Sequence, residues 1–171
     1  MSKKLLLKMA AAAILLVLIA VAILFVEGGG WCLTLSNRDT GKIYACYRMS
    51  EGDVFSIGFV HSVNKSPVID YYKIHDKKIY VIQTKYYDFG AGVQTEVEKG
   101  QTLSYGDDGS MIVSGFNKEM DNLVYCIGMV SDHTLQIGDK KIGLRALCGR
   151  GTLVRFSYGF HPIKLLLTGG I

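Results

Sequence analysis

The sequence lacks the short motifs that identify many enzyme and cofactor-binding classes. It has no Gly-x-Ser-x-Gly element, the turn that presents the nucleophile of many hydrolases. It has no Cys-x-x-Cys pair, so residue spacing gives no support for a thiolate metal site. The glycine-rich segment Gly90-Ala91-Gly92 is too short for a dinucleotide fingerprint, and no helix is predicted after it. We therefore expect no catalytic residue, no cofactor and no bound metal.

A basic surface is also lacking, which argues against a nucleic-acid partner. The formal net charge is +4, from 19 Lys and Arg against 15 Asp and Glu. Three of the basic residues, Lys3, Lys4 and Lys8, precede a long apolar segment, and removing them leaves 16 basic against 15 acidic residues, or +1. No basic cluster or aromatic-basic stripe remains in the rest of the chain, so we expect no binding to nucleic acid.

Residues 9–26 carry no polar side chain and are long enough to cross a bilayer. Two interpretations compete. A signal peptide could be cleaved at Ala20-Val21-Ala22, but cleavage would leave an apolar new terminus, and the run is long for a signal. We favour an uncleaved anchor over residues 1–26, a Gly-rich flexible spacer over 27–30 and a β-domain over 31–171. No Lys or Arg follows Lys8 until Arg38, so the positive-inside rule predicts a single-pass protein of the cell membrane. Its N-terminus would be cytoplasmic and its domain extracytoplasmic.

After this leader, no window has a sustained helical period, and short alternating segments are separated by turn signals. Two prolines and ten tyrosines agree with a β-rich chain. We predict an all-β fold, an antiparallel sandwich or a small barrel of about ten to twelve short strands. Residues 117–122 could hold one helical turn. The other expected strands, besides the central hairpin, cover residues 31–35, 42–48, 78–87, 94–98, 102–105, 111–114, 123–130, 134–137, 141–144 and 152–158.

The four cysteines, Cys32, Cys46, Cys126 and Cys148, all follow the leader. Outside the cytoplasm four cysteines allow two disulfides in any of three pairings. Cys46 and Cys126 lie in apolar runs, where a buried free thiol is equally compatible with the pattern. The pairing stays open at the level of sequence.

The central stretch, residues 53–74, reads as two strands joined by the turn Asn64-Lys65-Ser66-Pro67. Its alternation puts His61 and Asp70 on the same apolar face, where each polar group needs a partner. The two side chains could form an acid/base or ligand-gripping pair, or a satisfied pair that only fixes strand register. Ser62 faces away from His61 by the same alternation, which argues against a serine nucleophile.

Four further residues are candidates for ligand or partner contact. Gly90 and Gly92 predict a tight loop where another backbone or a ligand can approach closely. Asp132 and His133 predict a turn in which Asp132 binds nearby amides. Together with His61, Ser62 and Asp70, they complete the set of candidate contact residues.

A wider pattern covers roughly residues 31–158, and its most specific elements are His61-Ser62-Val63 and Gly90-Ala91-Gly92. With this pattern the chain resembles an uncharacterised bacterial and archaeal family, domain of unknown function eighteen-fifty. This sequence has Asp70 where the family pattern has Glu, so the carboxylate sits on a shorter arm. The remaining segments that carry the resemblance are Asp53, Pro67-Val68, Tyr71-Tyr72, Ile74, Phe89, Val93, Gly109, Asp132-His133, Leu135 and Gly149-Arg150-Gly151-Thr152.

Members of that family carry one N-terminal hydrophobic segment and are encoded beside TAXI-type tripartite (TRAP) transporters. The resemblance implies an accessory role outside the membrane, with the transporter's membrane subunit or solute-binding protein as partner. It supplies no catalytic residues. Two alternatives remain. One is a lipocalin-like small-ligand carrier, a small barrel whose mouth is guarded by His61 and Asp70 and in which Arg155 would cover Trp31. The other is an enzyme that uses the same His61 and Asp70 pair.

Overall fold

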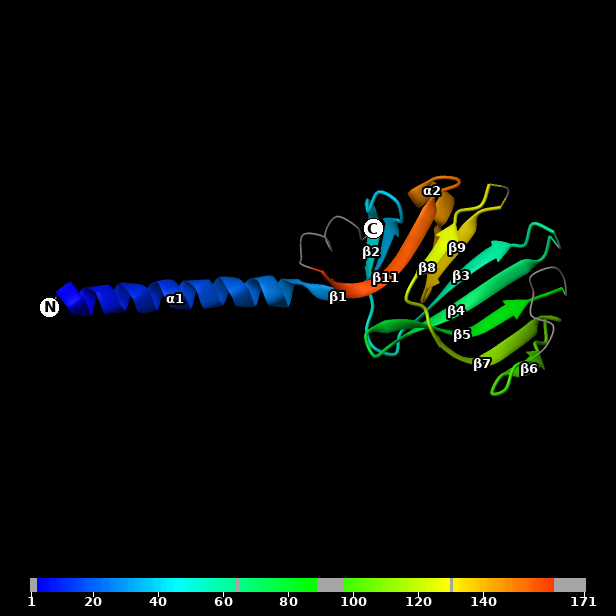
Figure 1. Ribbon diagram of the computed structural model, residues 1–171, viewed down its shortest axis with the longest axis horizontal. Coiled ribbons are helices and arrows are strands. Elements are labelled where there is room, and N and C mark those ends of the chain that lie inside the picture. Colours follow the sequence, from blue (N-terminus) through cyan, green and yellow to red (C-terminus); the bar gives the residue numbers. More distant parts are fainter. Residues whose placement is uncertain (1–2, 64, 89–96, 130, 162–171) are drawn as a thin grey trace.

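The computed structural model describes residues 3–63, 65–88, 97–129 and 131–161. In this part of the chain a long helix precedes eleven strands and one short helix (Figure 1). The elements are α1 (Lys3–Gly28), β1 (Gly30–Asn37), β2 (Ile43–Arg48), β3 (Val54–Val60), β4 (Pro67–His75), β5 (Lys78–Tyr86), β6 (Thr102–Tyr105), β7 (Met111–Glu119), β8 (Leu123–Cys126), β9 (His133–Ile137), β10 (Lys140–Gly143), α2 (Leu144–Cys148) and β11 (Leu153–His161).

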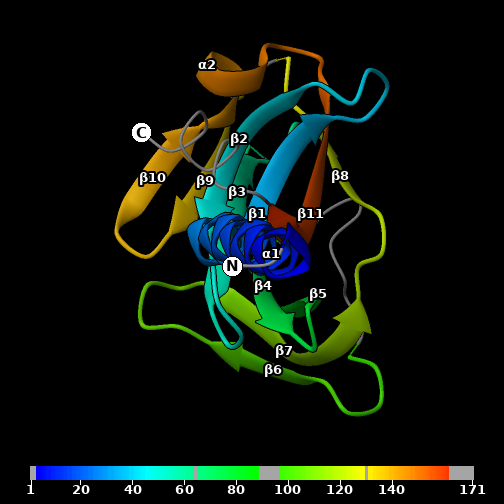
Figure 2. The same ribbon diagram turned by 90° about the vertical axis from the view of Figure 1, so that its left-hand side faces the viewer.

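Helix α1 is long and apolar enough to cross a membrane. No proline or glycine interrupts its sequence before Gly28, so the backbone hydrogen bonds propagate over 26 residues, a length of about 39 Å. β1 begins at Gly30, so only Gly29 separates helix from strand. Of residues 27–30, for which the sequence predicts a spacer, the structure assigns all but Gly29 to α1 or β1. In Figure 2, viewed along α1, the end of the domain that adjoins the helix faces the viewer.

The strands form two antiparallel sheets that do not close into a barrel. The four-stranded sheet has the order β2-β1-β11-β8, and the seven-stranded sheet has the order β10-β9-β3-β4-β5-β7-β6. The predicted antiparallel sandwich is confirmed, and the barrel alternative is wrong. The chain crosses between the sheets after β2, β7, β8 and β10, so strands distant in sequence become neighbours.

The main core lies between the two sheets and follows the alternation seen in the sequence. Leu33 and Leu35 of β1 contribute from the four-stranded sheet, and Phe55 and Ile57 of β3 contribute from the seven-stranded sheet. All four are buried, and each such side chain stabilises the fold by about 1.5–3 kcal/mol. A smaller apolar cluster of Val68, Tyr86, Met111 and Val113 lies on β4, β5 and β7.

Three elements differ from the sequence-based expectation. β7 continues to Glu119 instead of giving way to a helical turn, because β5 is long enough to pair with Lys118 and Glu119. β8 ends at Cys126, well short of the expected residue 130. α2 was not predicted, because a five-residue helix is too short to leave a helical period in the sequence. Most of the expected strand over residues 94–98 lies outside the described residues.

Candidate functional site

Asp70 lies on the inner face of β4, and its carboxylate connects the two sheets. It stands opposite Ile57 of β3 and is half-buried. Its Oδ1 accepts a hydrogen bond from the hydroxyl of Thr84 on β5 at 2.8 Å. Its Oδ2 accepts one from the hydroxyl of Tyr125 on β8 at 2.6 Å. Because β8 belongs to the four-stranded sheet, the second bond crosses the interior of the sandwich.

The hydroxyl of Tyr125 also lies 2.6 Å from that of Tyr72. Tyr125 has one hydroxyl proton and donates it to Asp70, so Tyr72 must donate to Tyr125. Burial raises the pKa of both phenols, and the nearby charge of Asp70 raises each pKa further. Both therefore stay protonated donors at neutral pH. The result is a chain of hydrogen bonds, the Asp70 network, formed by Tyr72, Tyr125, Asp70 and Thr84.

His61 does not join Asp70 in the described part of the structure. β3 ends at Val60, so His61 is the first residue of the connection to β4 rather than the last residue of a strand. Its main chain closes that turn, since its N–H donates to Ser66 O at 2.9 Å and its carbonyl accepts from the N–H of Lys65 at 3.0 Å. Its Nδ1 lies 3.4 Å from the N–H of Val63. The expected pair therefore fails because alternation stops where the strand stops, and Asp70 instead binds Thr84 on the neighbouring strand and Tyr125 across the sandwich.

His133 takes the place near the Asp70 network that the sequence suggested for His61. It is buried on β9, and its ring stacks on Phe59 and meets the ring of Tyr125 edge-on, with centroid distances of 5.1 and 5.7 Å. Its Nδ1 accepts the N–H of Gly128 at 3.1 Å, which places the proton of the neutral ring on Nε2. Burial lowers the pKa of His133, since the charged imidazolium is disfavoured there.

Asp132 binds backbone amides, as its sequence context predicts. Its Oδ1 accepts the N–H of His133 at 2.7 Å and the N–H of Arg145 in α2 at 2.8 Å. It therefore fixes the start of β9 against α2.

Ser62 is exposed in the turn after β3, while Gly90 and Gly92 lie outside the described residues. Of the predicted site residues, the structure brings Asp70 and His133 to the same tyrosine, Tyr125.

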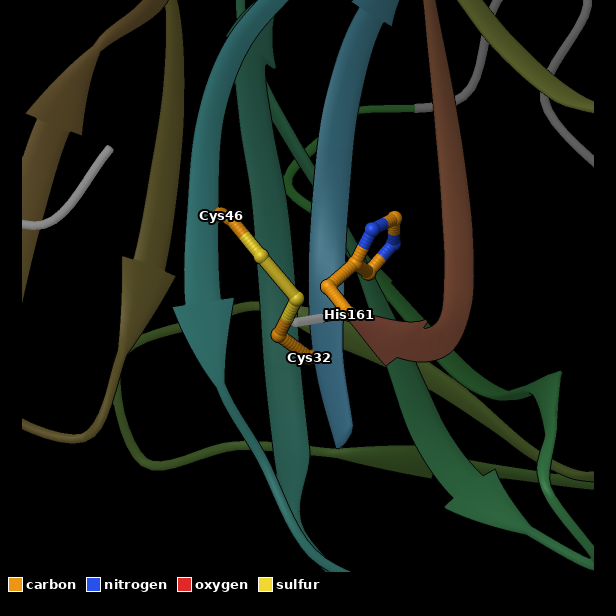
Figure 3. Close-up of side chains that lie close together, drawn as sticks. All are labelled: Cys32, Cys46 and His161. Atoms are coloured by element: carbon orange, nitrogen blue, oxygen red, sulfur yellow. A yellow bond between two sulfur atoms is a disulfide. The ribbon is translucent and has the colours of Figure 1, made fainter. Parts of the chain in front are cut away.

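A second cluster lies on the outer face of the four-stranded sheet (Figure 3). Cys32 of β1 and Cys46 of β2 form a disulfide, with Cα atoms 5.8 Å apart. The Nε2 atom of His161, at the end of β11, lies 2.8 Å from Thr34 Oγ1, and both sulfur atoms are close to that ring. The sulfur atoms and one ring nitrogen lie within 4.8 Å of one another, so reduction of the disulfide would create a two-thiolate, one-imidazole set that suits a zinc-like ion. The intact disulfide offers no thiolate for that purpose.

The other two cysteines remain free, Cys126 exposed and Cys148 buried. The structure thus selects one disulfide among the pairings that the sequence left open.

The expected cover of Trp31 by Arg155 is not formed: Arg155 is exposed and stands opposite Ser36. The cation over the Trp31 ring is Lys77, whose Nζ lies 5.2 Å from the centroid.

Sequence reasoning missed Thr84, Tyr125 and His161. Tyr125 lies in a run of apolar residues, where a tyrosine is ordinary for a strand, and Thr84 lies in a strand where its type is common. Nothing in the local spacing marks either as a partner of Asp70. His161 follows the last expected strand, and only the extension of β11 to that residue brings it beside β1.

The chain matches one protein-family model. This family model matches residues 55–144, just over half of the chain, and describes a domain of unknown function, DUF1850. The chain belongs to this family. The matched DUF1850 region begins in β3 and ends at the first residue of α2, so it contains Asp70, Thr84, Tyr125 and His133. No curated protein and no solved structure matches the chain.

Proposed function

We propose that this chain is a membrane-tethered binding module, whose β-domain stands outside the cytoplasm and assists a TAXI-type tripartite transporter. The observation that carries the proposal is the junction of α1 and β1. A helix able to cross a membrane is followed after one residue by the first strand of the sandwich. Such a junction keeps the domain at the membrane surface, where weak contacts with other membrane proteins suffice because tethering raises their effective concentration.

Two features support an extracytoplasmic domain. Lys3, Lys4 and Lys8 precede or begin the apolar helix, and the next basic residue is Arg38, a charge bias that favours a cytoplasmic N-terminus. The Cys32–Cys46 disulfide suits an oxidising compartment and would be rare in the cytosol.

The end of the domain away from α1 offers a surface for a partner. Val60 is 40%, Val63 66% and Met129 59% exposed, and we call these three residues the distal patch. The β3–β4 turn that carries Val63 lies at the far end of the domain from α1 in Figure 1. The hydroxyl of Ser131 donates to Val60 O at 3.0 Å, which holds the loop after β8 against the end of β3. Exposed apolar side chains on joined loops suit a protein contact, and methionine adapts readily to a partner surface.

Binding fits the polar residues of the domain better than catalysis does. Both carboxylate oxygens of Asp70 accept hydrogen bonds from within the fold, and the hydroxyl of Tyr125 is used twice. The resemblance to transporter-associated family members makes the transporter's solute-binding protein the partner of choice. That protein occupies the same compartment as the distal patch in the proposed orientation.

Site-specific photocross-linking in membranes tests this proposal. A photoreactive benzophenone amino acid at Val63 should capture the solute-binding protein or the membrane subunit of the transporter in cells that express it. The matched control is the same amino acid at Ile43, which is also exposed and apolar but lies on β2 of the other sheet. Capture of neither subunit from Val63, or equal capture from both positions, would refute the assignment of the distal patch.

A further inference from the structure

The opposite end of the domain, next to α1, contains a groove of about 780 Å³. Its lining comes from four places in the chain: the start of β1, the end of β2 with the connection to β3, the β4–β5 turn, and Tyr158 of β11. We call it the Trp31 groove. In Figure 1 these turns lie at the same end of the sandwich as the α1–β1 junction. If α1 crosses a membrane, the groove lies at the end of the domain nearest that membrane.

The chain geometry puts Trp31 within reach of the lipid headgroups. The last apolar residue of the helix sequence is Val26, and Trp31 lies five positions further along the chain. Two helical residues at about 1.5 Å and three extended residues at about 3.3 Å put the Trp31 backbone at most about 13 Å beyond the hydrocarbon edge. The headgroup layer is about 5–8 Å thick on each side of a bilayer. A side chain as long as tryptophan bridges much of the remaining gap.

Aromatic side chains at this end have the character of a membrane interface. The ring of Trp31 stacks on Tyr158, with centroids 5.3 Å apart, and meets Phe160 edge-on at 6.3 Å. Trp31 is 36% and Phe160 47% exposed, although both are large and apolar. Tryptophan and tyrosine are enriched at the level of the headgroups, where an apolar ring with a polar edge is most stable.

Two basic side chains of the groove are available to a phosphate. Arg48 and Lys77 both line it, and neither forms an ion pair with a carboxylate among the described residues. Glu51 and Asp76 line it as well, so the two charges of each sign balance. Glu51 is held at the β4–β5 turn, because it accepts hydrogen bonds from the N–H groups of Asp76 and Lys77 and from His75, which lower the pKa of its carboxyl. Asp76 lies 3.7 Å from His75 Nε2. Arg48 and Lys77 are thus the two charged groups of the groove that have no partner of opposite charge among the described residues, although the Nζ of Lys77 lies over the Trp31 ring.

We propose that the Trp31 groove binds the headgroup of a phospholipid from the bilayer that α1 crosses. The guanidinium of Arg48 and the ammonium of Lys77 would hold the phosphate, the guanidinium in its bidentate geometry. Trp31 and Phe160 would rest against the glycerol and upper acyl chain. This inference rests on the proposed membrane tethering and deepens it, since it fixes how the domain sits on the surface.

The chain has a single tryptophan, so the fluorescence of Trp31 reports directly on the groove. The full chain is reconstituted in phosphatidylcholine nanodiscs with increasing phosphatidylglycerol, the latter brominated near the top of its acyl chains. We expect Trp31 emission to be quenched as phosphatidylglycerol increases. The double variant Arg48→Gln/Lys77→Gln should need at least about tenfold more anionic lipid for the same quenching, because each basic residue near an anionic surface contributes appreciably to binding.

The matched control is Lys140→Gln/Lys141→Gln, which removes two exposed charges from β10 on the far edge of the seven-stranded sheet. It should bind as the unchanged chain does, and circular dichroism should confirm that all variants are folded. Quenching that is absent in every lipid, or unchanged in the Arg48/Lys77 variant, would overturn the lipid site. A change in Trp31 emission of the same size on adding inorganic phosphate to the chain in neutral detergent would also overturn the lipid site, in favour of a soluble anion.

Failure of the tethering itself is separately visible. Alkaline carbonate releases proteins that only adhere to a membrane, so release of the chain would refute the proposed function together with the lipid site. Retention in the carbonate-washed membrane without quenching of Trp31 would refute the lipid site alone.

Discussion

The Asp70 network makes a sharp prediction, that replacing Tyr125 by Phe destabilises the sandwich although only one oxygen atom is lost. The change leaves Asp70 Oδ2 without its donor and Tyr72 without its acceptor, both in the space between the sheets. Leaving a charged acceptor unpaired at this half-buried position costs about 2–3 kcal/mol. For a domain of about 150 residues, 1 kcal/mol corresponds to about 2–4 °C in Tm, so the expected decrease is about 4–12 °C.

The assay is thermal unfolding of the full chain in detergent, followed by circular dichroism in the β-sheet region. The matched control is Tyr71→Phe, because Tyr71 is the neighbouring residue on β4 and points to the opposite face of the sheet. It should change stability by no more than about 0.5 kcal/mol. Thr84→Val should give an intermediate loss of about 1–2 kcal/mol, because it removes only the neutral donor to Oδ1. Equal Tm values for Tyr125→Phe and Tyr71→Phe would show that the network does not hold the sheets together.

If the domain is extracytoplasmic, a membrane-impermeant maleimide should label the exposed Cys126 on spheroplasts. Cys148 should stay unlabelled, because burial raises the pKa of its thiol to about 11. Labelling of Cys126 only after lysis would place the domain in the cytoplasm. The pKa of His133 is lowered on folding, so the unfolded chain takes up the proton at a higher pH than the folded chain does. The free energy of unfolding should therefore fall as pH decreases below about 6.5. A His133→Gln variant with the same pH dependence would contradict the role given to His133. Replacing both Cys32 and Cys46 by Ala should cost about 3 kcal/mol in denaturant unfolding, the loop-closure value for about 15 residues, and a reductant should lower the stability of the unchanged chain but not of the variant.

The position of Trp31 shows how a local signal acquires its meaning from the fold. In the sequence, one tryptophan at the start of a strand is compatible with core, barrel closure or membrane interface. The fold decides among them, since the turns after β2 and β4 bring Arg48 and Lys77 beside the ring. No spacing along the chain predicts that meeting, because the three positions are connected only through the pairing of their strands.

The sequence alone determined the features that depend on near neighbours. An uninterrupted apolar run predicts α1, and alternation with turn residues predicts an antiparallel sandwich or barrel and the inward position of Asp70. These properties are local, because helix formation and the facing of strand residues depend on a few adjacent positions. The sequence pattern also places His61 in the strand, whereas β3 ends at Val60.

Tertiary structure alone decided which side chains meet. Tyr125 reaches Asp70 because β8 pairs with β11 in the opposite sheet, and Cys32 bonds to Cys46 because β1 and β2 are adjacent. Both contacts depend on the order of strands in the two sheets, a property of the whole chain. Backbone hydrogen bonds allow many strand orders with equal ease, and the burial of the common core selects one of them.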